Sequence, residues 1–449
     1  MRFVPNSTIK GTMFKEMRIN DIEELFSDIP KKIGIEKLDM PKGLSQQDAE
    51  QKLRVIANKN KSFYDVTSFL GGGIKPHYIP SVVKSIISRA EFYTSYTPYQ
   101  PEASQGFLQA MFEYQSIIAE LTGMDISNCS LYDGFTALSE AALMCTRINR
   151  KKTFVIPQNI SWEKKSILKN YAKGPGIEIK EVTYDIETGK IDIEEFKKHV
   201  NANTSGVYIE NPNFFGVFED KVDEISSIVK DAGSLFVVGI DPISLGVTKS
   251  PGEYGADIVI GEGRPFGNPM DFGGSSLGIF ACRNKYVRQM PGRLIGLTKD
   301  TDGKRAFCMA FQTREQHIRR GRATSNICTN EGLCALAAVS YLSWLGSNGL
   351  QKLSRINFEK GQKLAESIEL IDGFKRIFSG VHFNEFVIKC NKDVKKVNKK
   401  LLSKYIQGGL ILETWYPTLK NCMLFGITEM HANVDIERLV SALKEESYV

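Results

Sequence analysis

Between residues 130 and 281, short apolar runs alternate with stretches of helical pattern, and this alternation constrains the fold more than any other feature. The predicted strands are residues 153–156, 177–183, 207–209, 235–240, 258–260 and 277–281. The predicted helices are residues 137–148, 163–171, 193–199 and 222–231. Strands and helices in alternation are typical of a mostly parallel sheet that helices cover on both faces. The sequence therefore predicts an α/β fold.

Polar residues follow several of these strands, and ligands of such sheets bind beyond the carboxyl ends of the strands. These polar stretches are residues 157–159, 210–213, 241–242 and 261–264. Asp241 is the most specific, because it comes directly after the apolar run 235–240. Its carboxylate either caps the following turn or pairs with a cationic atom of a ligand.

The length of 449 residues suffices for more than one domain, and we expect three parts. Residues 1–65 are predicted to form a helical extension, residues 66–325 the large α/β domain and residues 326–449 a small C-terminal α+β domain. An apolar helix at 333–345 is expected to link the last two. The predicted elements of the small domain are strands 383–388, 410–412 and 423–427 and helices 394–406 and 434–443.

Two capping signals mark helices in the N-terminal extension. Asn20 is expected to cap a short helix, with Glu23 at the capping-box position. Ser45, followed by Asp48, is expected to begin a second helix. The run Gly71-Gly72-Gly73 lacks the Lys-Ser/Thr ending of a phosphate loop, so a tight turn is predicted there.

The composition excludes several classes of protein. A net charge of +6 is mild, and without an RNP motif, zinc-finger spacing or long basic tail the sequence does not predict a nucleic-acid partner. The start lacks the apolar core of a signal peptide, and no segment approaches 18 uninterrupted apolar residues, so no membrane association is expected. The eight cysteines are scattered without a Cys-x-x-Cys pair. We expect a reduced, cytoplasmic protein without a metal site.

The segment 91–106 is rich in aromatic residues and is stiffened by Pro98 and Pro101. Aromatic rings that carry hydroxyls are costly both to expose and to bury without partners. The segment is either a rigid loop packed on its own domain or an arm that lines a site or contacts another subunit. The helix predicted at 107–121 fixes its far end, and Gly123 is expected to terminate that helix.

Residues 312–326 form the densest basic cluster, with Arg314, Arg319, Arg320 and Arg322. Guanidinium groups suit recognition of carboxylates or phosphates. A solvated helix face is the alternative for such a run of charge.

Three motifs resemble the glycine cleavage system P-protein (glycine dehydrogenase, decarboxylating), in its subunit 1 or N-terminal-half type. They are Tyr93-Thr-Ser-Tyr-Thr-Pro-Tyr-Gln-Pro-Glu-Ala-Ser-Gln-Gly106, Met290-Pro-Gly-Arg293 and Thr313-Arg-Glu-Gln-His-Ile-Arg-Arg320 with Ala323-Thr-Ser-Asn-Ile-Cys-Thr329. The resemblance covers essentially the whole chain. It implies a pyridoxal-phosphate-dependent fold of type I, with a mostly parallel sheet domain and a small C-terminal α+β domain.

In this family glycine forms an aldimine with pyridoxal phosphate and loses CO2, and the aminomethyl group passes to the lipoyl arm of the H-protein. The resemblance implies that the aldimine lysine belongs to the other subunit, in a His-Lys-Thr-Phe segment. The matching segment here is 263–269, which places Arg264 at the lysine position. A guanidinium stays protonated and cannot replace an amine there. No lysine occurs between Lys249 and Lys285, so none nearby in sequence can substitute.

Two further positions belong to a degenerate cofactor pocket. Asp241 matches the aspartate that pairs with the pyridine nitrogen. Ser161 falls near the ring-stacking histidine of the catalytic half, and Ser161-Trp162 also departs from the His-Pro pair usual in relatives of subunit 1.

The resemblance also implies an active-site arm and contacts to other molecules. The arm residues are Tyr93, Tyr96, Tyr99, Gln100, Glu102 and Gln105. The residues expected to contact an anion or a partner such as the acidic H-protein are Arg314, His317, Arg319 and Arg320.

The leading hypothesis is therefore a subunit that is active only with a lysine-bearing subunit 2, as a dimer of heterodimers (a heterotetramer) working with lipoylated H-protein. In this hypothesis the partner binds pyridoxal phosphate covalently, and this chain completes the site for glycine. The alternative is a non-catalytic binding or regulatory paralogue of the same fold. A third possibility is an autonomous pyridoxal enzyme that uses another lysine.

Overall fold

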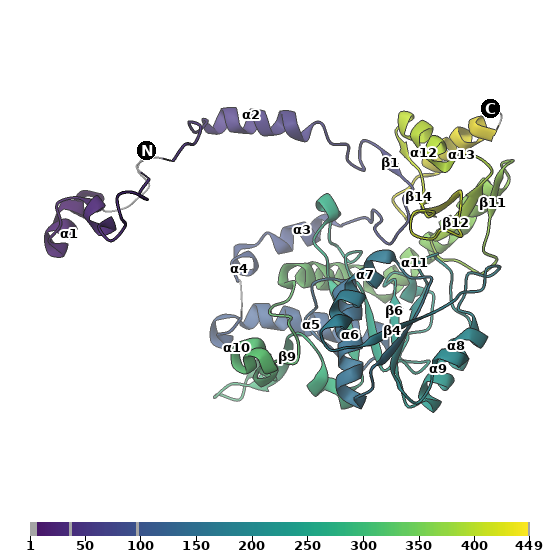
Figure 1. The fold of residues 1–449 in the computed structure, drawn as a ribbon, viewed down its shortest axis with the longest axis horizontal. Coiled ribbons are helices and arrows are strands. Elements are labelled where there is room, and N and C mark those ends of the chain that lie inside the picture. Colours follow the sequence, from purple (N-terminus) through teal and green to yellow (C-terminus); the bar gives the residue numbers. More distant parts are fainter. Residues whose placement is uncertain (1–6, 36–37, 96–97, 448–449) are drawn as a thin grey trace. The chain divides into compact units, whose positions relative to one another are not determined.

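The structure, a computed structural model, describes residues 7–35, 38–95 and 98–447 (Figure 1). Its contacts separate two compact units, Met1–Lys61 and Ser62–Val449. The expected division into a large domain at 66–325 and a small domain at 326–449 stays a prediction. Each unit is described here by itself.

The N-terminal unit contains short helices and has no core. Its elements are 3₁₀ helices at Ser7–Ile9 and Ile22–Phe26 and helices α1 (Lys10–Met17) and α2 (Gln46–Ala57). Ser45 caps α2 as predicted, because its Oγ accepts from the Asp48 amide at 3.1 Å. The cap of the short helix was predicted one residue early, since Asp21 rather than Asn20 adopts the extended backbone and forms a capping box with Glu24. None of the side chains described in this unit is buried.

The second unit is built on a mostly parallel sheet, which confirms the predicted fold class. Its strands are β2 (Ile126–Ser127), β3 (Thr153–Pro157), β4 (Glu178–Val182), β5 (Thr204–Asn211), β6 (Leu235–Ile240), β7 (Ile258–Glu262) and β8 (Gly278–Cys282). In the described chain they lie in the order β2-β8-β7-β6-β5-β3-β4. The strands from β7 to β4 are parallel, and β8 and β2 are antiparallel to their neighbours.

Helices cover both faces of this sheet, as the alternating pattern predicted. They are α6 (Gly134–Asn149), α7 (Trp162–Lys173), α8 (Ile193–His199) and α9 (Val222–Asp231). Successive strand residues point to opposite faces. Thus Val237 joins the core beneath α6 and α7, while Phe236 and Val238 join the core beneath α8 and α9. The polar carboxyl ends of the parallel strands consequently meet at one edge.

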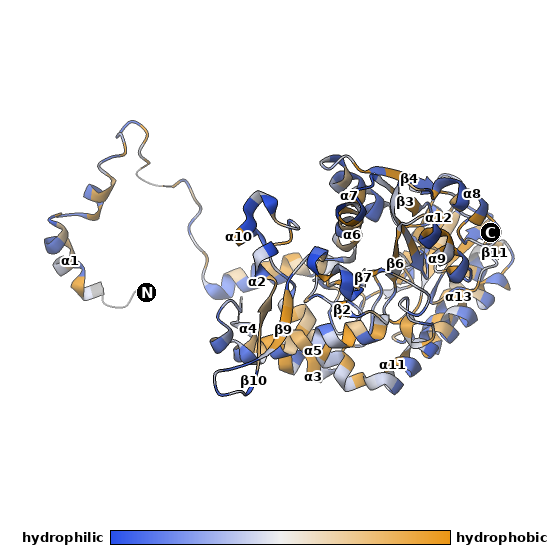
Figure 2. Cartoon of the chain, turned by 90° about the horizontal axis from the view of Figure 1, so that it is seen from below, coloured by the Kyte–Doolittle hydropathy of each residue, from blue (hydrophilic) through white to orange (hydrophobic). Residues whose placement is uncertain are grey.

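Helices α3 (Ser81–Ile87), α4 (Ala90–Tyr93) and α5 (Gln105–Thr122) precede this sheet in sequence. Helix α5 confirms the predicted helix, and Gly123 ends it in the left-handed region at φ 65°. An antiparallel ribbon of β9 (Leu294–Lys299) and β10 (Arg305–Ala310) packs on α5 and was not predicted. Helix α10 (Gln316–Arg319) follows and is largely hydrophilic, whereas β9 is largely hydrophobic (Figure 2).

Helix α11 (Gly332–Glu369) contains the predicted apolar helix and continues well beyond it. The expected end near residue 345 is confirmed, because Gly346 has a non-helical backbone at φ 66° and separates two helical segments within these bounds. By length and composition α11 could cross a membrane, but half of its most apolar window is buried inside this fold. A core helix meets the same criteria.

The C-terminal part forms a smaller antiparallel sheet in the order β11-β12-β15-β14. Its elements are β11 (Phe374–Arg376), β12 (Glu385–Cys390), β14 (Leu410–Ile411), β15 (Cys422–Gly426), α12 (Val394–Ser403) and α13 (Asn433–Ser447). Helix α12 ends three residues before the predicted position, because Ile406 belongs to β13 (Ile406–Gln407), which pairs with β1 (Thr67–Ser68). The segment after β1 then runs to the edge of the large sheet.

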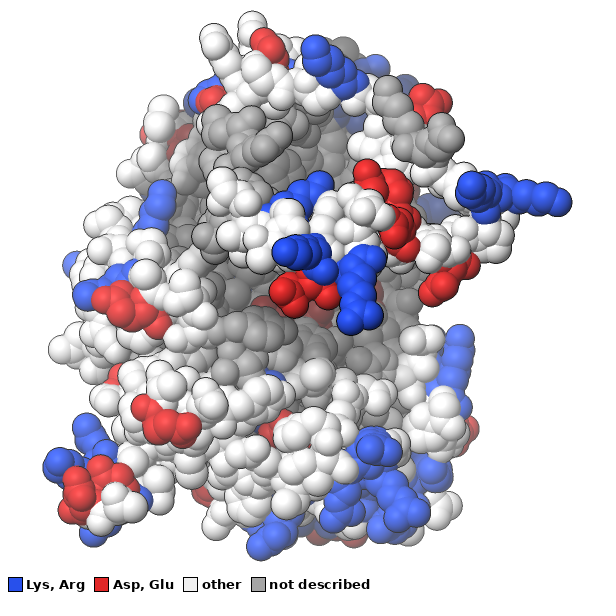
Figure 3. All heavy atoms as spheres, turned by 90° about the vertical axis from the view of Figure 1, so that its left-hand side faces the viewer, with Lys and Arg blue, Asp and Glu red and all other residues white. Residues whose placement is uncertain are grey.

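Charged side chains of both signs lie on the face drawn in Figure 3. Basic groups there neighbour acidic groups, as expected for a net charge of only +6. Among the residues drawn and described in this view, no continuous basic surface extends across the face.

Candidate functional site

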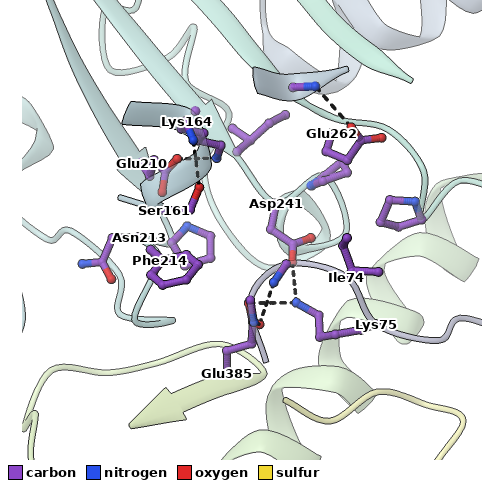
Figure 4. A pocket seen from close by; sticks show the side chains of 18 of the residues that line it. Ile74, Lys75, Ser161, Lys164, Glu210, Asn213, Phe214, Asp241, Glu262 and Glu385 are labelled. Carbon is purple, nitrogen blue, oxygen red and sulfur yellow. Dashed lines mark hydrogen bonds and ion pairs between the residues drawn. The ribbon is translucent and has the colours of Figure 1, made fainter. Parts of the chain in front are cut away.

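A pocket lies at the carboxyl ends of β5, β6 and β7, beside the first turn of α6, and its cavity holds about 120 Å³ (Figure 4). It brings together Asp241, Ser161 and Arg264, three residues that the sequence placed in one degenerate pocket. The segment after β1 and strand β12 of the smaller sheet close it from the other side. The strand ends thus meet where a parallel sheet binds ligands.

Lys75 is buried in this pocket between two carboxylates (Figure 4). Its Nζ lies 2.9 Å from Glu385 Oε2 and 3.6 Å from Asp241 Oδ2, and only 3% of its side chain is exposed. Asp241 also uses Oδ1 to accept from the Ile243 amide at 3.0 Å. The turn-capping alternative predicted for Asp241 is therefore confirmed, and the cation that it faces is a lysine of this chain.

The glycine run that precedes Lys75 holds the second carboxylate. The amides of Gly72 and Gly73 donate to Glu385 Oε1 at 2.6 and 3.0 Å. Both glycines have positive φ, 108° and 86°, which turns successive N–H groups toward one anion. The predicted tight turn is thus a bend that binds a carboxylate of the smaller sheet.

Charge stabilises this arrangement despite its burial. Burial alone would lower the pKa of Lys75, but Glu385 and then Asp241 outweigh it, and the pKa of Lys75 is raised. Burial alone would raise the pKa of Glu385, but Lys75 and the two glycine amides outweigh it, and the pKa of Glu385 is lowered. The two shifts agree on an ionised pair. A lysine held in this way is protonated and is not a nucleophile.

Glu262, at the end of β7, occupies the N-terminus of α6. Its Oε2 accepts from the Gly134 amide at 3.1 Å, and its Oε1 accepts from the Leu277 and Arg264 amides at 2.8 and 3.0 Å. Burial raises the pKa of Glu262, although these three amides and the Arg264 charge oppose the shift. A helix N-terminus is a general site for anions, and here a side chain of the same chain fills it.

Arg264 is hydrogen-bonded to the segment that precedes β8. Its Nε donates to the Ser275 carbonyl at 3.1 Å and its Nη2 to Ser276 Oγ at 2.8 Å. Among the described residues, its buried Nη1 has no hydrogen-bond partner. The guanidinium is therefore anchored to the segment just before β8.

On the opposite wall, Ser161 caps helix α7, because its Oγ accepts from the Lys164 amide at 3.3 Å. The Lys164 ammonium contacts Glu210, which also accepts from the Tyr208 hydroxyl at 2.7 Å. Lys164 and Lys75 are far from Arg264 in sequence. The fold therefore brings two lysines into the pocket that the sequence around Arg264 does not indicate, and both are ion-paired.

Tyr99 of the predicted arm contacts the region of the basic cluster. Arg293 Nη2 donates to the Tyr99 hydroxyl at 3.0 Å, and the guanidinium carbon lies 5.2 Å from the Tyr99 ring centre. The His317 ring packs edge-on against Tyr99 at 5.6 Å. Two motifs separated by about 200 residues in sequence thus meet at Tyr99.

Gln105 holds the arm in place through its side chain. Its Nε2 donates to the carbonyls of Pro101 and Phe307 at 2.7 and 2.8 Å, and its Oε1 accepts from the Phe307 amide at 2.9 Å. These bonds use both polar ends of the amide, so Gln105 anchors the arm to β10 instead of presenting a polar tip.

The other described arm residues have solvent-exposed side chains. Tyr93, Gln100 and Glu102 are exposed, and Tyr96 lies outside the described residues. None of the described arm residues lines the Lys75 pocket. The arm and the pocket are therefore separate groups of residues.

The residues of the basic cluster differ in how far their side chains are exposed. Arg314 is largely buried, its Nη2 donates to the Gly292 carbonyl at 2.6 Å, and burial lowers its pKa. His317, Arg319 and Arg320 are exposed. Arg314 thus has a structural contact near Tyr99, whereas the other three face solvent.

Comparison with known proteins identifies the family. Residues 1–443 match the family model described as "Glycine cleavage system P-protein". This chain belongs to that family. A relative from Thermococcus onnurineus, named "Probable glycine dehydrogenase (decarboxylating) subunit 1", is 48% identical over 99% of both chains. The predicted family is confirmed.

Solved structures confirm the fold. The crystal structure of a P-protein glycine decarboxylase in inhibitor-bound form matches with a TM-score of 0.92 and 37% identity, over 99% of this chain and 100% of that one. A Burkholderia pseudomallei sphingosine-1-phosphate lyase matches with a TM-score of 0.68 at 14% identity, over 93% of both chains. The fold is the pyridoxal-phosphate fold of type I that was predicted.

The residues of the pocket do not fit that cofactor. Pyridoxal phosphate requires a lysine for its imine, an aspartate for its pyridinium nitrogen and donors for its phosphate. Here Asp241 faces Lys75 of the same chain, and Glu262 occupies the start of α6. The cavity of about 120 Å³ is also smaller than the roughly 300–1,000 Å³ of typical small-molecule pockets.

Proposed function

We propose that this chain is subunit 1 of a two-subunit P-protein and is active only with a lysine-bearing subunit 2. The pair decarboxylates glycine and transfers the aminomethyl group to the lipoyl arm of the H-protein. Arg264 carries this proposal, because it places a non-nucleophilic guanidinium where the cofactor lysine stands, within a chain that matches the family over its length. Pyridoxal phosphate is accordingly bound covalently by subunit 2.

In this proposal the arm completes the partner's site. Tyr99 presents a hydroxyl that is already oriented by a buried guanidinium, Arg293, and its ring is held by His317. An oriented hydroxyl at the rim of a site can donate to a carboxylate or carbonyl of a ligand without a large entropic cost. Glycine and the lipoyl group both offer such atoms.

The exposed basic residues next to the arm have a second proposed role. His317, Arg319 and Arg320 form a surface that suits an acidic protein, and the H-protein of this family is acidic. Rim charges of this kind act mainly on the rate of association and on its salt dependence. We place the assembly, a dimer of heterodimers, in the cytoplasm.

A mixing assay tests the pairing. Each subunit alone is expected to fail to exchange labelled CO2 with glycine, and the mixture is expected to succeed in the presence of lipoylated H-protein. A fully active isolated chain would refute the proposal. Absence of any tight complex with a lysine-bearing subunit would favour a non-catalytic paralogue. The match of residues 1–443 to the family model does not favour that alternative. Sedimentation of the mixture measures the stoichiometry.

A further inference from the structure

Lys75 stands where a cationic ring nitrogen would face Asp241. In fold-type I enzymes an aspartate pairs with the protonated pyridine nitrogen of the cofactor. Here Asp241 Oδ2 faces the Lys75 ammonium at 3.6 Å, and Glu385 holds the same ammonium at 2.9 Å. Asp241 therefore already has a cationic partner, supplied by a loop far away in sequence.

Glu262 stands where an anion would meet the start of a helix. Helix α6 has 16 residues, and its first amide, that of Gly134, donates to Glu262 Oε2. The Asp133 side chain accepts from the Thr136 amide at 2.6 Å in the same turn. Two carboxylates thus accept from the Gly134 and Thr136 amides of the N-terminal turn, and a phosphate there would meet negative charge.

We propose that Lys75 and Glu262 are built-in replacements for the positive and negative ends of pyridoxal phosphate, and that they close this pocket to the cofactor even as a non-covalent ligand. The inference deepens the proposed function, which assigns the covalent cofactor to subunit 2. It adds that Lys75 and Glu262 of this chain occupy the charged positions of the pocket and exclude the cofactor.

The charges around the pocket support exclusion of a free anion. Three cationic side chains line it, those of Lys75, Lys164 and Arg264, and each is held by partners within the chain. Four carboxylates line it as well: Glu210, Asp241, Glu262 and Glu385. A doubly charged phosphate would therefore enter a pocket whose two lysines are ion-paired and whose four carboxylates outnumber its three cations.

The test is a titration of the isolated full-length chain with pyridoxal phosphate, followed by absorbance and by equilibrium dialysis. The wild-type chain is expected to show no saturable binding up to roughly 1 mM, the range of weak affinity. Borohydride is expected to leave no labelled lysine. Saturable binding or a labelled Lys75 or Lys164 would overturn the inference, while a positive mixing assay could still uphold the pairing of subunits.

Lys75→Ala and Glu262→Ala test the two replacements separately. Each removes one internal ion, and the double variant is expected to bind pyridoxal phosphate saturably, with a Kd at least about tenfold below the roughly 1 mM limit of the wild-type titration. Lys198→Ala is the matched control, because Lys198 forms an exposed pair with Glu195, and it is expected to behave as wild type. A folded double variant that still excludes the cofactor would overturn the inference.

Chemical rescue covers the case in which Lys75→Ala folds poorly. The substitution removes three carbons and an ammonium, which n-propylammonium can replace. We expect n-propylammonium, but not n-propanol, to raise the melting temperature of Lys75→Ala and to compete with any pyridoxal phosphate bound there. Equal effects of the amine and the alcohol would show that the cation is not what fills the pocket, and would refute the inference.

Discussion

Replacing Lys75 by methionine should destabilise the chain strongly. Methionine has a similar length and keeps the packing, so the loss is mainly electrostatic. Removal of one partner of a buried ion pair costs about 3–5 kcal/mol, because the remaining charge is buried without compensation. Glu385 keeps its two glycine amides and Asp241 keeps the Ile243 amide, so we expect the lower end, about 3 kcal/mol.

Urea unfolding of wild type and Lys75→Met, followed by tryptophan fluorescence, measures the difference in free energy of unfolding. Lys198→Met is the control and should leave the unfolding midpoint unchanged, since its pair with Glu195 is exposed. Adding Glu385→Gln to Lys75→Met should recover part of the loss, because the amide side chain removes one unpaired charge.

The stability difference between wild type and Lys75→Met should depend on pH. The lowered pKa of Glu385 contributes stability that is present above its ordinary value of 4.5 and is lost as the pH falls further. The raised pKa of Lys75 contributes stability that is present below its ordinary value of 10.5 and is lost as the pH rises further. The gap between wild type and Lys75→Met should therefore be widest between these limits. A gap under about 1 kcal/mol at neutral pH would refute the reasoning.

Four further substitutions test other parts of the structure. Tyr96→Phe and Tyr99→Phe should each slow the assembled enzyme without preventing assembly. Loss of the Tyr99 hydrogen bond should lower kcat/KM roughly three- to tenfold. Unchanged rates in both variants would show that the arm has only a packing role. Burial raises the pKa of Glu219 to about 7, so wild-type stability should fall by about 3 kcal/mol between pH 4.5 and 8, and Glu219→Gln should abolish that fall in urea titrations. Gly216→Ala, at φ 84° with its new Cβ 1.9 Å from a β12 carbonyl oxygen, should lower the melting temperature far more than Gly303→Ala, at φ 78° in open space.

The central fold was predictable because its signals are local. Runs such as 235–240 carry the strand pattern within themselves, and the structure places β6 there. The β9–β10 ribbon was missed because its apolar positions were not recognised as strands around the Asp300–Gly303 turn. The apolar helix was predicted to end near residue 345, where Gly346 interrupts α11, but the helical segment that follows Gly346 was not predicted.

The site was predictable only in part, for a related reason. Asp241 was found because it ends a strand, and Arg264 because a family motif marks its position. Lys75 and Glu385 lie in different parts of the chain, and no motif beside either residue predicts their ion pair. The only local trace is the glycine run before Lys75, whose amides bind Glu385. Pairings of this kind depend on tertiary structure.

The exposed apolar side chains of the N-terminal unit bear on how this unit becomes ordered. Its described residues contain exposed apolar side chains at Ile22, Leu25, Phe26 and Ile29, and none is buried. A segment that buries little apolar surface offsets little of the entropy lost on ordering, so we expect the described part of this unit to be stabilised by docking against another surface. If that surface belongs to another chain, the stability of this unit rises with the concentration of that chain.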